Sequence, residues 1–133
     1  MASLLVNSGL EQSGKRIAGI AGTTHIQCMS WDGQTTGFAA TDVALNSPGA
    51  VVAAFSPTSV TTVGTNTLRW EATLTTAQFN ASTVRRIALH FASTAAATTA
   101  TTFLYGGVDG QAILKTSEFS LVTLLDVTYS STQ

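Results

Sequence analysis

Apolar and polar residues alternate most regularly in residues 68–75, Leu-Arg-Trp-Glu-Ala-Thr-Leu-Thr. Successive side chains of a β-strand point to opposite faces, so this period of two predicts a strand with one buried face. A turn at residues 77–80, Ala-Gln-Phe-Asn, follows, and residues 84–91 return to a pattern of regularly spaced apolar positions. The segment 68–91 therefore predicts two half-buried strands joined by a corner.

The apolar positions of these two strands and of the last strand, residues 119–129, define the expected core. Each lies at the parity of its strand that carries most of the large apolar side chains. The predicted core residues are Leu68, Trp70, Leu74, Ile87, Leu89, Phe91, Leu121 and Val127. The last strand also carries Val122 and Leu124 at the opposite parity, which predicts a central strand or one that a partner covers on its second face.

Further short strands are predicted at residues 15–21, 24–31, 50–55, 60–63, 103–106 and 111–116, with turns between them. Roughly seven to nine strands with turns at short spacing are typical of an all-β fold, and we expect an antiparallel, jelly-roll-like β-sandwich. Residues 93–102 are almost entirely Ala and Thr and are predicted to form an exposed loop. Residues 1–12 fit either a short strand or an extended N-terminal arm that reaches a neighbouring subunit.

The composition favours assembly into a larger structure. A chain of 133 residues has room for one domain, so a single β-sandwich domain is expected over residues 1–133. Only 10% of the residues are charged, against about 25% in a typical soluble domain. The surface must then consist largely of Thr, Ser, Gln and Asn, and a weakly charged surface suits burial against neighbouring subunits.

Charge and hydropathy exclude two classes of partner. The net charge is −1 and the six basic residues form no basic patch, which argues against nucleic acid. No stretch approaches the roughly 18 apolar residues that a transmembrane helix needs, so no membrane partner is expected. A single cysteine, Cys28, rules out an internal disulfide, and we expect folding in a reducing cytoplasm.

No motif brings catalytic or metal-binding groups together, so we expect no enzymatic activity, no cofactor and no metal. His25 and Cys28 lie three positions apart, which places them on opposite faces of a strand, and His90 is the only other histidine. No Gly-x-Ser-x-Gly nucleophile elbow is present. Residues 106–110, Gly-Gly-Val-Asp-Gly, lack the Lys-Ser/Thr pair of a phosphate-binding loop and predict a hairpin turn.

Trp31 and the pair Arg85 and Arg86 are candidates for contacts at the surface. Trp31 lies at a strand end beside the Asp-Gly turn, where it suits either a subunit contact or a sugar-binding platform. Arg85 and Arg86 form a basic pair within a strand, and we expect a salt bridge in an oligomer, with Glu71 or Asp126 as its acid.

Two groups of motifs resemble a family of small structural proteins of tailed bacteriophages. Residues 5–10, Leu-Val-Asn-Ser-Gly-Leu, and 41–45, Thr-Asp-Val-Ala-Leu, are similar to that family's opening "L-x-N-x-G-L" and its "T-D-x-A-L" element. The strand and corner of residues 70–89 and the glycine turn with the final strand at 106–129 are also similar. The chain departs from the family where Arg-Ile-Ala-Leu, residues 86–89, replaces its acidic residue before a glycine-leucine pair.

The resemblance implies a virion component without catalytic residues. We expect a capsid decoration (cement) protein on the outer capsid surface, made in the host cytoplasm, with the major capsid protein and further copies of itself, as a dimer or trimer, for partners. A tail or baseplate fibre module and a carbohydrate-binding module that uses Trp31 are the alternatives. The residues expected to form subunit or capsid contacts are Leu4, Leu5, Val6, Trp31, Arg85 and Arg86.

Overall fold

The structure, a computed structural model, describes residues 2–20, 25–42, 53–54, 60–92 and 103–129. Within these ranges the chain is mostly β-strand in antiparallel sheets, with one short helix, so the all-β prediction is confirmed. The elements are β1 (Ala2–Leu5), α1 (Asn7–Ile17), β2 (His25–Asp32), β3 (Ala53–Ala54), β4 (Val60–Thr62), β5 (Thr67–Leu74), β6 (Ser82–Val84), β7 (Arg86–Ala92), β8 (Phe103–Asp109), β9 (Ile113–Lys115) and β10 (Leu121–Thr128).

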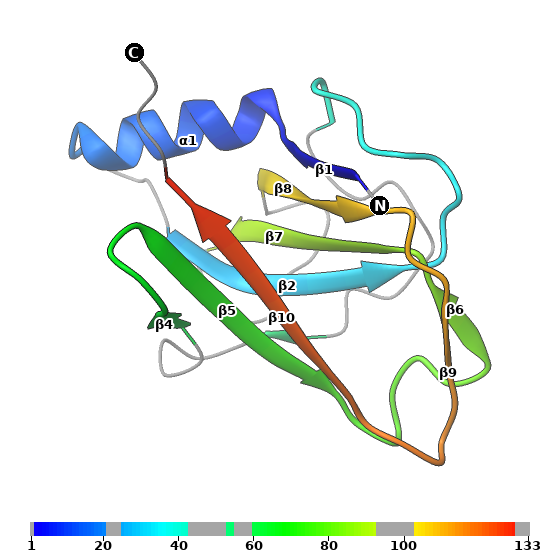
Figure 1. Cartoon of the computed structure of the whole chain (residues 1–133). Coiled ribbons are helices and arrows are strands. Elements are labelled where there is room, and N and C mark those ends of the chain that lie inside the picture. Colours follow the sequence, from blue (N-terminus) through cyan, green and yellow to red (C-terminus); the bar gives the residue numbers. More distant parts are fainter. Residues whose placement is uncertain (1, 21–24, 43–52, 55–59, 93–102, 130–133) are drawn as a thin grey trace.

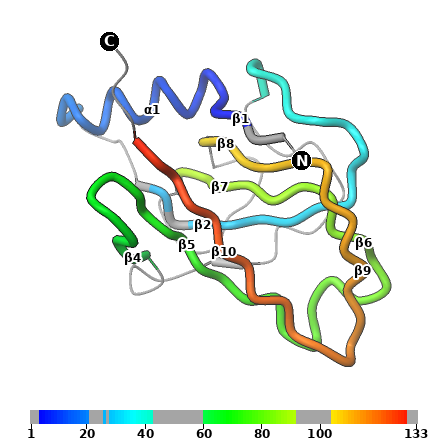
Figure 2. Tube along the Cα trace, in the orientation of Figure 1, coloured from blue at the N-terminus to red at the C-terminus, as the bar shows by residue number. Residues whose placement is uncertain are grey.

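The described strands form three sheets. The largest has the order β1-β8-β7-β2-β3, the second has the order β10-β5-β4, and β6 pairs with β9. Figure 1 shows β10 crossing obliquely over β2 and β7, with β5 running beside β10 and α1 beside β1 and β8. The Cα trace in Figure 2 shows that the last strand runs back across the molecule beside β5.

The main core lies between the two larger sheets. Trp70 and Leu74 of β5 belong to one cluster with Met29 of β2 and Leu89 of β7. The structure places the eight core candidates in or against this cluster: Trp70, Leu74, Ile87, Leu89 and Phe91 are buried, and Leu68, Leu121 and Val127 are partly buried and pack against them. Burial of these side chains supplies most of the driving force for folding, at about 1.5–3 kcal/mol for each large one.

The N-terminal segment is part of the fold and not a free arm. β1 pairs antiparallel with β8, with Leu4 opposite Gly107 and Leu5 opposite Gly106. Val6, at the N-cap of α1, is completely buried in a second small cluster with Ala88 and Leu104, on the side of the five-stranded sheet away from the main core. Of the two possibilities left open for residues 1–12, the strand is present, and the extended-arm interpretation was wrong.

The helix α1 was missed, and the strand predicted at residues 15–21 was wrong, because Lys15 and Arg16 belong to the last turn of this helix. The helix turns no apolar stripe toward the sheet, since the residues that it buries are Ser8, Gly9 and Gln12. Ser8 donates a hydrogen bond to the carbonyl oxygen of Leu104, 2.8 Å away. Small and polar side chains thus let the helix approach the sheet closely, and they carry no hydrophobic period to detect.

Two glycines of this helix are expected to respond to alanine in opposite directions. A Cβ at Gly9 would overlap the carbonyl oxygen of Tyr105, whereas nothing lies within 4 Å of a Cβ at Gly14. We expect Gly9→Ala to lower the free energy of unfolding by about 1–3 kcal/mol and Gly14→Ala to raise it by about 0.5–1 kcal/mol. Urea denaturation of both variants tests this, and equal effects would contradict the close packing of α1.

Two further predictions change in the structure. Residues 84–91 contain the end of β6 and most of β7, which are separate strands on either side of Arg85. The hairpin turn predicted at 106–110 is absent, because β8 continues to Asp109 and β9 pairs with β6 instead of β8. The Ala/Thr-rich loop predicted at 93–102 lies outside the described residues.

Candidate functional site

One arginine of the predicted pair, Arg86, uses its charged group inside the domain. Asp32 at the end of β2 lies opposite Arg86 at the start of β7. The Arg86 guanidinium donates from Nε to Oδ1 at 2.9 Å and from Nη2 to Oδ2 at 2.5 Å, and the Phe38 ring lies 5.0 Å from its central carbon. Arg86 is 7% exposed and Asp32 is fully buried. The prediction that Glu71 or Asp126 pairs with Arg86 was therefore wrong, because its partner is Asp32. Arg86 is also not a surface contact.

The second arginine of the pair has a backbone role. The Arg85 N–H donates to the Asp32 carbonyl oxygen at 2.8 Å, and the Arg85 carbonyl oxygen accepts from the N–H of Gln111 at 3.0 Å. Arg85 is half-buried. Its hydrogen bonds connect the break between β6 and β7 to two other parts of the chain.

Asp126 pairs with a different arginine. Arg69 of β5 lies opposite Asp126 of β10 and donates two hydrogen bonds to its carboxylate, at 2.7 and 2.9 Å. These hydrogen bonds lower the pKa of Asp126 and raise that of Arg69. The single charge that β10 places on the outer face of its sheet is thereby neutralised within the domain.

Trp31 has no exposed surface. Its indole N–H donates to the hydroxyl of Thr123 on β10, 3.0 Å away, so it joins the two larger sheets through the core. A side chain in this position cannot stack on a sugar or touch a neighbouring subunit. The sequence interpretation of Trp31 as a contact residue or sugar platform was wrong.

The structure places one nucleophile and one base together, but away from the surface. Ser30 Oγ and His90 Nε2 are 2.5 Å apart on neighbouring strands β2 and β7. Ser30 is fully buried and His90 is 1% exposed, so solvent has almost no access to either group. Burial lowers the pKa of His90 to about 4.

This low pKa predicts that acid destabilises the fold. An unfolded histidine has a pKa near 6.5, so between pH 6.5 and 4 the unfolded state binds more protons than the folded state. Neutral His90 therefore contributes to the free energy of unfolding above pH 6.5. This contribution, about 3 kcal/mol in total, is lost as the pH falls from 6.5 toward 4. Urea denaturation at a series of pH values measures it, and the His90→Gln variant should show a flatter dependence. An equally steep dependence in that variant would contradict the assignment.

The surface feature most suited to an interaction is the strand β10. It pairs with β5 over eight consecutive residues, and no described strand pairs with its other edge. Val122 and Leu124, on the outer face of the sheet, are 56% and 47% exposed. Across from them on β5 lie Thr73 and Glu71. β10 is therefore an edge strand with apolar residues on both faces, and not the central strand that is one of the two options its sequence predicts.

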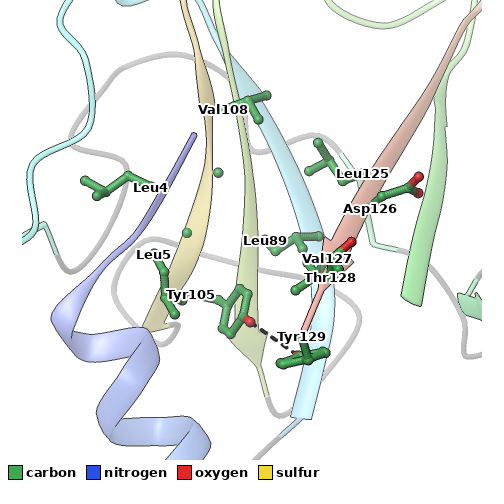
Figure 3. A pocket seen from close by; sticks show the side chains of 12 residues that line it. Leu4, Leu5, Leu89, Tyr105, Val108, Leu125, Asp126, Val127, Thr128 and Tyr129 are labelled. Atoms are coloured by element: carbon green, nitrogen blue, oxygen red, sulfur yellow. Dashed lines mark hydrogen bonds between the residues drawn. The ribbon is translucent and has the colours of Figure 1, made fainter. Parts of the chain in front are cut away.

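A pocket of about 320 Å³ lies beside this free edge (Figure 3). On one side it is lined by Leu4 and Leu5 with residues 105–108 of β8, and on the other by residues 125–129. The hydroxyl groups of Tyr105 and Tyr129 form a hydrogen bond of 3.2 Å at one end. Burial, and then this hydrogen bond, raise the pKa of Tyr105. The pocket thus lies between β1 and β8 of the five-stranded sheet and β10 of the three-stranded sheet, and its walls are mainly apolar.

The expected contact residues are only partly brought together. Leu4 and Leu5 line the pocket, while Val6, Trp31 and Arg86 are buried elsewhere. Val122, Leu124 and Tyr129 were not among the predicted contacts, although the two apolar parities of residues 119–129 were the signal that could have found them. Leu10 and Ile17, 55% and 88% exposed on α1, form a second apolar area.

The part of the chain that the structure describes contains neither a cluster of metal-binding side chains nor a membrane-spanning helix. No group of three or more His, Cys, Asp or Glu side chains there is arranged to hold a metal ion. No helix in the same ranges has the length and hydropathy to cross a bilayer.

Comparison with protein-family models, curated proteins and solved structures finds no match to this chain. The functional interpretation therefore rests on the surface described above and on the sequence motifs.

Proposed function

We propose that the chain is a structural protein of a tailed-bacteriophage virion, specifically a decoration protein that binds the outer surface of the head and stabilises it. Its partners are the major capsid protein and other copies of itself. It is made in the cytoplasm of the bacterial host and acts without a catalytic centre. The observation that carries the proposal is the weakly charged, apolar free edge of β10 beside an apolar pocket.

A strand edge of this kind suits a component whose task is assembly. Exposed apolar surface and unpaired strand edges are costly in an isolated soluble protein, because they invite contact with other chains. They are useful where neighbours cover them. Among the described residues, β10 and the outward side of α1 are such areas, so one copy has surface available for two different neighbours.

The resemblance of the sequence to structural proteins of tailed bacteriophages supports a virion as the assembly. We also propose that the two larger sheets form a jelly-roll-like sandwich, which suits a close-packed shell component. The support is that several neighbouring strands, such as β1 with β8 and β2 with β7, are far apart along the chain.

Copy number in purified phage particles tests the proposal. A decoration protein should be present in a copy number comparable to that of the major capsid protein, because it binds a repeated lattice. Quantitative gel densitometry or mass spectrometry of particles measures this ratio. A small fraction of that number would favour the tail or baseplate module, and absence of the chain from washed particles would overturn the virion assignment.

A further inference from the structure

The free edge of β10 has a defined set of backbone groups available for pairing. The N–H of Tyr129 donates to the carbonyl oxygen of Asn66, 2.8 Å away, on the β5 side. In an antiparallel ladder, alternate residues direct their N–H and C=O groups to opposite edges. Val122, Leu124, Asp126 and Thr128 therefore direct their backbone groups to the free edge, and their side chains lie on the outer face.

The sequence and pairing of β10 carry no protection against the addition of another strand. Natural edge strands are commonly blocked by lysine, proline, bulges or short length. β10 is eight residues long, contains no Lys, Pro or Gly, and pairs with β5 without a register shift. Its one charge, Asp126, is already neutralised by Arg69. The edge is consequently ready to accept another strand.

The pocket beside the edge determines what kind of strand fits. A strand added to β10 would point every second side chain toward the pocket, whose walls include Leu5, Leu89 and Leu125. It would place the intervening side chains beside Val122 and Leu124 on the outer face. The added strand must therefore be apolar at both parities, with little charge.

β10 itself meets this requirement. On the inner face of the sheet it carries Leu121, Thr123, Leu125 and Val127, of which Leu125 and Val127 line the pocket, and its outer positions include Val122 and Leu124. An antiparallel pair of identical strands is closed by a two-fold axis, so it ends with two copies and leaves no new free edge on β10. These features favour a second copy of this chain over an unrelated peptide.

Pairing of the full strand, together with avoidance of like charges, selects the register. The register that uses the whole strand is centred on Leu125, and it places Leu124 opposite Asp126 of the second copy. The two Asp126 carboxylates then avoid lying opposite each other, which would be unfavourable. Every edge-directed residue then has a partner in the second copy. Val122 pairs with Thr128 and Leu124 pairs with Asp126, and the two-fold axis repeats each pair with the copies exchanged.

We propose that the protein forms a two-fold dimer through antiparallel pairing of β10 with β10 of a second copy, centred on Leu125. The dimer joins the two three-stranded sheets into one continuous six-stranded sheet and covers the pocket of each copy with residues of the other. Its role in the particle rests on the proposed function, whereas its formation is a property of the purified protein.

Sedimentation equilibrium of purified variants tests the dimer. Leu124→Pro removes an edge-directed N–H and no hydrogen bond to β5, so it should weaken dimerisation while the sheet remains intact. The loss of two intermolecular hydrogen bonds should raise the dissociation constant about thirtyfold. Val122→Lys with Leu124→Lys should have a larger effect. Matched controls are Leu114→Lys on β9 and Ile17→Lys on α1, both at exposed apolar positions, and they should leave the dimer unchanged.

Hydrogen exchange followed by NMR provides a readout that does not depend on a variant that may misfold. In the dimer the amides of Val122, Leu124, Asp126 and Thr128 should be protected, and dilution to monomer should expose these four while the intervening amides stay protected. A wild-type protein that is monomeric or trimeric, a dimer lost in Ile17→Lys but kept in Leu124→Pro, or four unprotected edge amides would each overturn the proposal. A dimer that is absent from phage particles would instead contradict the proposed function alone.

Discussion

Replacing Asp32 by asparagine is expected to lower the free energy of unfolding by about 3–5 kcal/mol. Asp32 is fully buried and holds the guanidinium of Arg86, itself 7% exposed. The variant leaves Arg86 charged in the interior without its carboxylate, and a buried charge without a partner is strongly unfavourable. Denaturation in urea, followed by circular dichroism, measures the change.

A matched pair of charges on the surface provides the control. Asp126 accepts two hydrogen bonds from Arg69 in a geometry similar to that of Asp32, but this pair is exposed to solvent. Asp126→Asn should therefore change stability much less than Asp32→Asn, because water replaces the lost interaction. Equal effects of the two variants would contradict the burial of the Asp32–Arg86 pair.

A double variant separates the charge from the packing. Asp32→Leu combined with Arg86→Met removes both charges and keeps much of the buried volume, so it should be more stable than either single variant. The free energies of unfolding of Asp32→Leu, Arg86→Met and the double variant together decide whether the loss of stability comes from a lone buried charge. Losses that simply add would indicate that the two side chains act independently.

Trp31→Ala is expected to lower the free energy of unfolding by about 3–5 kcal/mol. The side chain is fully buried between the two larger sheets, so its removal leaves a cavity, and it also leaves the hydroxyl of Thr123 without the indole N–H. Trp31→Phe should cost less, because most of the volume remains. Circular dichroism during urea denaturation is the suitable measurement, since Trp70 also contributes to fluorescence.

The comparison for this prediction is Leu114→Ala, at a position that is 58% exposed. That substitution should have little effect, because it removes few contacts and creates no cavity. If Trp31→Ala were as mild as Leu114→Ala, the tryptophan would have to be exposed, and a surface role for it would return.

Period-two patterns predicted the parts of the fold that depend on one buried face. β5 and β10 alternate clearly, and their register places apolar residues of both strands against the same core. The helix α1 was not predictable in this way, because the residues that it buries are Ser8, Gly9 and Gln12 instead of apolar side chains. Its close approach depends on Tyr105, which is distant along the chain.

The candidate site was predictable only in its general character. Low charge and two apolar parities in residues 119–129 indicated a surface to be covered, but they could not distinguish a central strand from a free edge. That distinction depends on which strands lie beside β10. Likewise, the Trp-Asp-Gly run at residues 31–33 resembled an ordinary turn, whereas pairing with β7 buries both Trp31 and Asp32.

Electron cryomicroscopy of the phage particle tests the virion assignment most directly. We predict density for this domain at many equivalent positions on the outer surface of the head, in contact with the major capsid protein. Antibodies against the purified chain should label the same surface. A map in which the outer head surface carries no such density, together with particles that lack the chain, would contradict the proposed function.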